Sequence, residues 1–397
     1  MCKKLESLCL TKKGRVADDD GYDPEYDSKI GEIFKNNCAI KQIFLRNFSL
    51  SGSCFEHIIN PSLLTSLKLV RCVGLDAVTL KSFLQEASSL LKFAIIDAPS
   101  PDWFNFCVIK GLLSSNCPLM ELHLEGCESS FDDDMISELF KLKKKLKKMY
   151  LSDYVISYEN IREFPNFSEL ALDNVKFNIP FLTFYRNKLV NLAWLSLFNC
   201  KITDQILKLI KLACNLRQLD LSGCTFDISD GDKEGSMTNL EKIYVVDCAD
   251  VCDSFIAEIV KCKKLSSLSY RACNGVDVVR FFEMIKDILT LKTLDLSGID
   301  TLVLPRVDKM NSESRLLIEV VINNKGLINL DLFDLHYLPE EFLGYLDNAM
   351  LFENRTLNVF WEFSSDSLQQ IVSNLKLFSV PFNDYTAIED KCNHFDE

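Results

Sequence analysis

The sequence contains little of the residue that most often carries acid–base chemistry in enzymes, since histidine occurs only four times in 397 residues. No Ser/His/Asp or Cys/His set can be assembled from so few histidines. Neither the GxGxxG nor the GxxxxGK[ST] phosphate-binding pattern occurs. We therefore expect a protein that is not an enzyme and that uses no cofactor.

Paired cysteines of the CxxC type are also missing, although the chain has 16 cysteines. Without such pairs, and with scattered histidines, the sequence gives no support for a zinc site, so we expect no metal. Many cysteines instead recur at fixed places in a repeat, which indicates small buried hydrophobic side chains. Abundant reduced thiol is typical of the cytoplasm or nucleus, where we expect the protein to reside.

No stretch approaches 18 apolar residues, and the start MCKKLESLCL lacks the apolar run of a signal peptide, so we expect no membrane partner. The net charge of −13 and the pI near 5.0 argue against a nucleic-acid partner, because nucleic acid is itself polyanionic. The basic run KLKKKLKKM (141–149) is the exception, and we interpret it as a solvated helix end.

A nine-residue pattern is present along the whole chain: leucine, two residues, leucine, one residue, leucine, two residues, then cysteine or another small apolar residue. Clear copies are LTSLKLVRC (64–72), LMELHLEGC (119–127), LAWLSLFNC (192–200), LRQLDLSGC (216–224), LEKIYVVDC (240–248) and LSSLSYRAC (265–273). Most copies start 21 to 29 residues apart. That period predicts a leucine-rich-repeat solenoid.

The predicted fold is therefore an α/β horseshoe with parallel strands on the concave face and helices on the convex face. Neighbouring repeats share one core, so we expect a single solenoid of about 14 repeats over residues 1–380, irregular at both ends, followed by a polar tail at 381–397. Met1 lies only four residues before a repeat leucine, which leads us to expect that the chain is an incomplete version of a longer protein.

The repeat that starts at Leu192 illustrates the expected unit. Leu195 and Leu197 point inward from a short strand, and Thr203 and Asp204 can cap the following helix. Further along, we expect helices at RLLIEVVI (315–322) and LPEEFLGYL (338–346), and two final strands in RTLNVFWEF (355–363) and VSNLKLFSV (372–380). ADDDGYDPEYD (17–27) and DISDGDKEGS (227–236) are predicted to be acidic loops.

The copies that end in cysteine, with KITDQILKLI (201–210) after the best of them, resemble the cysteine-containing subclass of leucine-rich repeats. That subclass is typical of the F-box/leucine-rich-repeat family, the substrate receptors of SCF-type cullin–RING ubiquitin ligases. The resemblance implies that the repeats select a protein substrate and that an F-box binds a Skp-type adaptor. No F-box precedes the repeats in this chain, so adaptor and cullin binding would require one upstream.

The concave strand positions follow from the alternation of side chains along a strand. In the central repeats they hold four aromatic residues, five carboxylates and one histidine. The aromatic residues are Tyr150, Trp194, Phe198 and Tyr244; the others are Glu121, His123, Glu125, Glu169, Asp173 and Asp220. We expect these aromatic side chains to be exposed anchors for a partner, and the carboxylates to favour a basic protein segment. His123 is interpreted as a surface contact and not as a base.

The leading hypothesis from the sequence is a substrate-receptor subunit of a ubiquitin ligase that holds its substrate on the concave sheet. The alternative is a free-standing leucine-rich-repeat adaptor or inhibitor with no ubiquitin link. A regulator of a small GTPase is a third reading, which no particular residue favours.

Overall fold

The computed structural model describes residues 5–13, 24–97, 103–125, 133–152, 155–156, 165–174, 176–177, 186–229, 237–299, 312–333, 335, 338, 341–361 and 374–378. The chain forms two compact units, Met1–Leu197 and Phe198–Glu397. No helix among the described residues combines the length and the apolar content that crossing a lipid bilayer requires.

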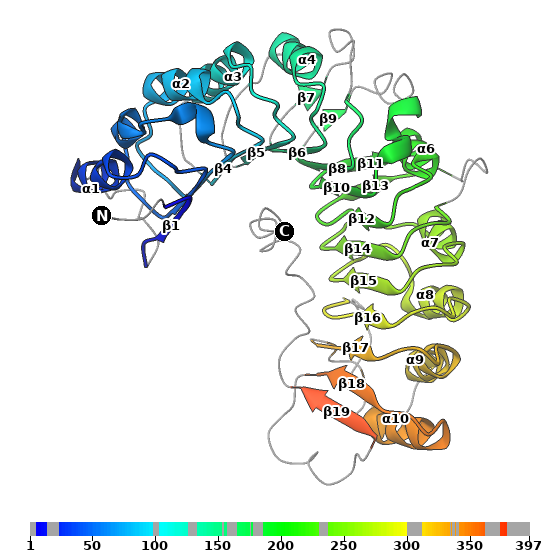
Figure 1. Ribbon diagram of the computed structural model, residues 1–397. Coiled ribbons are helices and arrows are strands. Elements are labelled where there is room, and N and C mark those ends of the chain that lie inside the picture. Colours follow the sequence, from blue (N-terminus) through cyan, green and yellow to red (C-terminus); the bar gives the residue numbers. More distant parts are fainter. Residues whose placement is uncertain are drawn as a thin grey trace. The chain divides into compact units, whose positions relative to one another are not determined.

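The first unit alternates strands with helices or short 3₁₀ turns (Figure 1). Its long sheet has the order β1-β2-β3-β4-β5-β6-β8-β10, which is also the order along the chain. The elements are β1 (Ser7–Thr11), α1 (Pro24–Lys35), β2 (Gln42–Arg46), η1 (Ser53–His57), η2 (Pro61–Leu63), β3 (Ser66–Val70), α2 (Ala77–Glu86), β4 (Lys92–Ile96), α3 (Trp103–Ser114), β5 (Glu121–Glu125), α4 (Asp133–Leu142), β6 (Lys148–Ser152), β7 (Val155–Ile156), β8 (Glu169–Asp173), β9 (Lys176–Phe177), η3 (Arg186–Asn191) and β10 (Trp194–Phe198).

The second unit repeats the same plan, with its long sheet in the order β12-β14-β15-β16-β17-β18-β19. Its elements are β11 (Lys201–Thr203), α6 (Asp204–Leu212), β12 (Gln218–Asp220), β13 (Thr225–Asp227), β14 (Lys242–Val246), α7 (Asp253–Val260), β15 (Ser267–Arg271), α8 (Val278–Ile285), β16 (Thr293–Asp295), α9 (Ser312–Asn323), β17 (Asn329–Asp331), α10 (Glu341–Phe352), β18 (Leu357–Phe360) and β19 (Leu375–Phe378).

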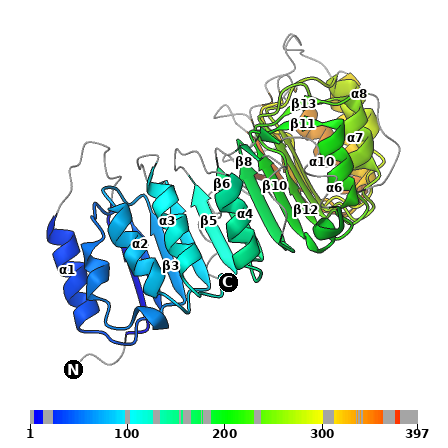
Figure 2. The same ribbon diagram turned by 90° about the horizontal axis from the view of Figure 1, so that it is seen from above.

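The repeat leucines form the core between the strands and the helices. In the first unit the helices lie on one face of the strands (Figure 2). On β5, Leu122 and Leu124 are 0% and 1% exposed, and Leu294 and Leu330 occupy the same place in the second unit at 0%. Each fully buried leucine contributes about 1.5–3 kcal/mol relative to an exposed one. Parallel strands in chain order with helices between them confirm the predicted fold class, an α/β leucine-rich-repeat solenoid.

Several local predictions are confirmed. RLLIEVVI lies in α9, LPEEFLGYL contributes to α10, and the two last strands are β18 and β19. In the unit that starts at Leu192, Leu195 and Leu197 are buried, and Thr203 is the N-cap of α6, although its side chain makes no capping hydrogen bond. Residues 230–236 of the second acidic loop and the tail at 381–397 lie outside the described residues.

The first acidic loop is corrected at its end. Residues 24–27 are the first turn of α1, and Asp27 is only 3% exposed. Its carboxylate accepts hydrogen bonds from Ser51 N at 2.7 Å, Ser51 Oγ at 2.9 Å and Cys54 N at 3.1 Å. Asp27 thereby joins α1 to the start of η1, a structural role that the polar composition of the segment concealed.

Several strands of the long sheets are followed by a residue in the left-handed conformation, whose backbone N–H donates to a carbonyl of the next repeat. Arg71, Asp247 and Ala272 have φ of 51°, 51° and 48°. Their N–H groups reach Ile96 O at 2.8 Å, Arg271 O at 3.0 Å and Ser297 O at 3.0 Å. Residues other than glycine rarely adopt this conformation. Its recurrence indicates that the backbone hydrogen bonds between repeats hold the chain in it.

The cysteines that follow the strands are buried, as predicted. Their thiols donate to carbonyl groups of the preceding repeat, with Cys72 Sγ 3.5 Å from Leu45 O and Cys248 Sγ 3.0 Å from Leu221 O. The members of this set that the structure describes are Cys72, Cys200, Cys224, Cys248 and Cys273, whereas Cys127 lies outside it. The slot therefore needs a small hydrophobic side chain with a weak donor, which cysteine supplies.

A second cysteine position, just before the strands, follows this rule only in part. Cys117 and Cys262 are buried, but Cys38 and Cys214 are exposed, so the expectation of burial is wrong for these two. They lie in the turns that lead from a helix to a strand, on the solvent side. Cys2 lies outside the described residues.

We expect a thiol reagent to separate these two kinds of cysteine in the native protein. Burial raises the pKa of Cys72 and of Cys262 to about 12, which leaves almost no reactive thiolate at neutral pH. Exposed Cys9, Cys38 and Cys214 should react first, and the buried thiols only as the protein unfolds. Peptide mass spectrometry after timed labelling measures the order of reaction, with a denatured sample as control. Early labelling of Cys248 would contradict the burial of the cysteines that follow the strands.

Candidate functional site

The face of the first unit's sheet that the helices do not cover, here called the open face, carries the predicted site residues of that unit. Each strand presents three side chains there: a first, a middle and a third position. On β5 these are Glu121, His123 and Glu125. Strand pairing aligns the middle residues Ala94, His123, Tyr150 and Ala171 in one row across β4, β5, β6 and β8.

Three rings of this open face form a continuous aromatic stack. The imidazole of His123 lies 4.7 Å from the ring of Tyr150 with an interplanar angle of 24°, and Tyr150 lies 5.5 Å from Trp194 at 45°. Ala171 stands opposite Tyr150 on β8. Trp194, the last ring of the stack, is partly exposed.

Tyr150 is fixed in place and does not project into solvent. It is 5% exposed, and its hydroxyl donates to Glu169 Oε2 at 3.0 Å. Burial, together with the charges of Glu169 and Glu121, raises the pKa of Tyr150 well above its ordinary value. The expectation that Tyr150 is an exposed anchor is wrong, because the rings of His123 and Trp194 lie against it.

His123 is also buried, at 0% exposure, and not the surface contact that the sequence suggested. Its Nε2 lies 2.6 Å from Oε2 of Glu125 on the same strand. The imidazole is therefore held between a carboxylate and the ring of Tyr150. A solvent-borne substrate has no direct path to it in this conformation.

The carboxylates of the first position alternate with lysines. Lys92 Nζ lies 3.3 Å from Glu121 Oε2, and Lys148 Nζ lies 3.0 Å from Glu169 Oε1. These ion pairs offset the negative field that the sequence predicts for the same stretch. Glu125 and Asp173, in the third position, are partly exposed, so the acidic character of the open face is concentrated there.

The remaining predicted site residues belong to the second unit. Phe198 is partly exposed, whereas Tyr244 is 5% exposed, so the expected exposure is wrong for Tyr244 as well. Asp220 is 2% exposed and accepts hydrogen bonds from Ser222 N at 3.0 Å and Ser222 Oγ at 2.6 Å. Its carboxylate closes the turn after β12 and contributes little to the outer field.

The aspartate at this place is a recurring turn device in the second unit. Asp295 accepts from Ser297 N at 3.0 Å and Ser297 Oγ at 2.7 Å, and Asp331 accepts from Phe333 N at 2.9 Å. The shared sequence LDLSG in the repeats of Asp220 and Asp295 signals it, since aspartate often accepts a hydrogen bond from the backbone N–H two residues further on.

The sequence analysis missed Lys92, the partner of Glu121, because the repeat of Lys92, ending at Ala98, departs from the leucine pattern.

The arrangement presents one partly exposed ring, Trp194, beside two buried rings. Tyr150 is held by its hydrogen bond to Glu169 and His123 by its contact with Glu125, and the ring of Trp194 is tilted against that of Tyr150. Within the part of the chain that the structure describes, no group of three or more His, Cys, Asp or Glu residues could hold a metal ion.

Comparisons with known proteins give little beyond the fold. No family model and no curated protein matches the chain. Among solved structures, the crystal structure of the Rad7 and Elc1 complex in yeast contains a similar chain, with a TM-score of 0.45 and 16% sequence identity. The similarity covers 89% of this chain and 87% of that chain. At this TM-score and identity it supports no inference about partners.

Proposed function

We propose that this chain is a non-enzymatic protein-recognition module that holds a segment of another protein on the open face of its first unit. The observation that supports the proposal most directly is the stack of His123, Tyr150 and Trp194, whose outer ring is accessible while its inner rings are immobilised. A preorganised aromatic side chain offers a large contact area at small entropic cost, which is typical of interface hot spots.

The chemistry around Trp194 indicates the partner. Glu169 lies at the same end of the neighbouring strand and is 28% exposed beside its lysine, whereas the partly exposed Glu125 and Asp173 lie at the other end of their strands. An apolar or aromatic side chain of the partner would pack on Trp194, with a basic residue next to it facing Glu169 and basic residues further along the segment facing Glu125 and Asp173. Because lysines pair with Glu121 and Glu169, we expect the apolar contact to contribute more affinity than the charges.

We further propose that the recognised protein is a substrate for ubiquitination, with this chain acting as receptor in an SCF-type ligase in the cytoplasm or nucleus. The support is the resemblance of the cysteine-ended repeats to the F-box/leucine-rich-repeat family, which is an analogy of repeat class. A Skp-type adaptor and a cullin would then belong to the same assembly. Affinity purification from cells under proteasome inhibition tests this: recovery without adaptor or cullin would favour a free-standing adaptor or inhibitor.

We expect Trp194→Ala to reduce capture of the partner by about tenfold or more, because it removes the accessible ring of the stack. Trp194→Phe should retain most of the capture, since it keeps a ring on Tyr150. Quantitative pull-down from lysate measures both variants. Tyr345→Ala is the control, because Tyr345 is an aromatic residue at 51% exposure on α10 of the second unit, outside the proposed site. Full capture by Trp194→Ala with an unchanged circular dichroism spectrum would contradict the proposal.

A further inference from the structure

The second unit has a strongly basic edge where its helices end and its strands begin. This helix-to-strand edge consists of residues 213–217, 237–241, 261–266, 286–292, 324–328, 353–356 and 374. These segments contain eight cations and three anions. The cations are Arg217, Lys261, Lys263, Lys264, Lys286, Lys292, Lys325 and Arg355, and the anions are Glu241, Asp287 and Glu353. The edge is thus positive in a chain whose net charge is −13.

Part of this charge serves the fold. Cations are favoured at helix C-termini, and Arg355 Nη1 donates to Asn324 O, next to the end of α9, at 2.7 Å. Other side chains exceed that need. Lys325 is 79% exposed and reaches Glu353 only at 3.8 Å, while Lys263, Lys286 and Lys292 make no ion pair with any described residue. A positive field therefore remains along the edge.

The same edge exposes large apolar side chains. Leu289 and Ile328, in the segments before β16 and β17, are 63% and 51% exposed. Leu351 and Phe352, in the last turn of α10 beside it, are 60% and 88% exposed. Among the described residues of the second unit, only Tyr345 and Phe378 are other large hydrophobic residues with comparable exposure. Apolar side chains gathered at one place on a protein indicate an interaction surface.

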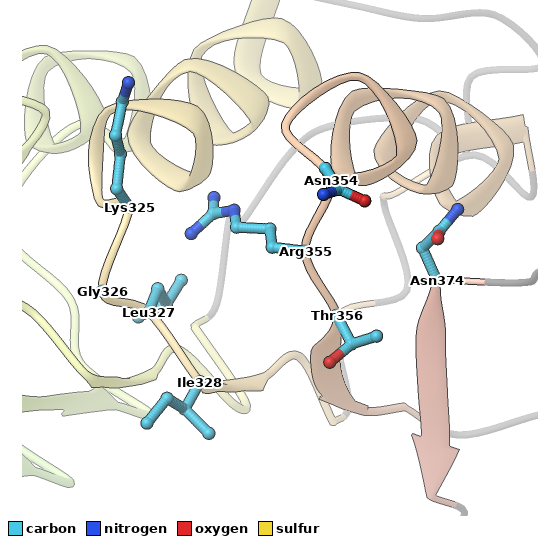
Figure 3. Close-up of a pocket in the computed structure, with 8 residues that line it drawn as sticks. All are labelled: Lys325, Gly326, Leu327, Ile328, Asn354, Arg355, Thr356 and Asn374. Carbon is cyan, nitrogen blue, oxygen red and sulfur yellow. The ribbon is translucent and has the colours of Figure 1, made fainter.

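A hollow of about 580 Å³ lies on this edge, between the segments that lead into β17, β18 and β19 (Figure 3). Its lining combines Lys325 and Arg355 with the apolar Leu327 and Ile328 and with amide or hydroxyl groups. The polar lining residues are Asn354, Thr356 and Asn374. Figure 3 shows the guanidinium of Arg355 lying between the segment of Lys325 and the start of β18.

We propose that this helix-to-strand edge is a second protein-binding surface, which takes an acidic segment in which carboxylates alternate with large apolar side chains. Carboxylates would face Lys292 and Lys325, and the apolar side chains would cover Leu289 and Ile328. An acidic protein segment fits better than nucleic acid, because a phosphate backbone supplies no apolar side chains for these residues and the chain as a whole repels a long polyanion. This surface is distinct from the open face and does not depend on it.

Fluorescence anisotropy of the full chain with a labelled peptide of alternating Glu and Leu tests the proposal. The double variant Lys292→Glu/Lys325→Glu should weaken binding about tenfold or more, and Ile328→Ser about fivefold. Lys201→Glu is the matched control: Lys201 is 63% exposed on β11, away from this edge, and should leave binding unchanged. The expected affinity falls with added salt, because the charges are exposed.

Three results would overturn the proposal. The first is equal peptide binding by the wild-type chain and the double variant. The second is equal binding of a matched peptide with Gln in place of Glu, which would show that charge does not matter. The third is preferential binding of a uridine oligonucleotide that the double variant abolishes, which would make the edge a nucleic-acid surface. The substituted lysines are exposed, so a thermal melt is expected to confirm that the double variant folds.

Discussion

Glu258→Ala is expected to destabilise the protein by about 3–5 kcal/mol, the usual cost of removing one member of a buried ion pair. Glu258 on α7 lies 3.0 Å from Nζ of Lys211 on α6, and the two side chains are 8% and 2% exposed. Lys261 reaches the same Oε1 at 2.8 Å but is itself 53% exposed. Removing Glu258 therefore takes a carboxylate away from the buried ammonium of Lys211, while the exposed Lys261 can turn to water.

Urea denaturation with an unchanged slope measures the effect as a lower midpoint. The double variant Lys211→Met/Glu258→Leu should recover most of the loss, because well-packed apolar residues often replace a buried ion pair without cost. Glu25→Ala is the matched surface control: its pair with Lys29 is 2.6 Å long but about two-thirds exposed, so the loss should be below about 1 kcal/mol. Equal losses in Glu258→Ala and Glu25→Ala would contradict the interpretation.

Asp27→Ala is expected to cost about 2–4 kcal/mol, because it leaves the buried N–H groups of Ser51 and Cys54 without their acceptor. Burial acts to raise the pKa of Asp27, but the hydrogen bonds from Ser51 and Cys54 together outweigh it, so the pKa is lowered from 3.8. A lowered folded-state pKa means that this stabilisation is complete above about pH 4 and is lost as the pH falls through the folded value.

The stability difference between wild type and Asp27→Ala should therefore be constant near neutral pH and shrink in acid. Chemical denaturation at a series of pH values between about 3 and 7 measures it. Asp27→Asn provides the control, because the amide keeps one acceptor oxygen but cannot titrate, and its stability should show no contribution from this position. A wild-type advantage that grows in acid would show that Asp27 is not the group responsible.

The fold could be predicted from the sequence because the same leucine pattern recurs along the whole chain. Leu122, Leu294 and Leu330 each occupy the position that the pattern assigns, and strand order follows from the spacing alone. What the pattern could not reveal is the role of single polar residues. Asp27 belongs to a segment with the composition of a loop, yet its carboxylate is buried by contacts with residues more than 20 positions away.

The candidate site was predicted in outline and corrected in detail. Alternation along the strands placed His123, Tyr150 and Glu169 on the open face, but it carries no information on what neighbouring strands place beside them. Tyr150 is buried because His123 and Trp194 cover its ring. The charge of Glu169 is offset by an ion pair with Lys148, which lies opposite it on the neighbouring strand. Whether a side chain on a sheet is buried or ion-paired depends on the residues of the adjacent strands, so it cannot be predicted from the sequence of one strand.

The left-handed residue that follows several of the strands affects which substitutions and deletions the fold can accept. Its register-setting contact is made by the backbone N–H, so asparagine, arginine, aspartate, glycine and alanine all occupy the position in different repeats. Replacing the side chain leaves the N–H in place, except that a side chain at Gly223 would collide with Asn199 Oδ1. Deleting one residue would move the N–H away from the carbonyl of the next repeat. The chain therefore tolerates substitutions at most of these positions far better than insertions or deletions.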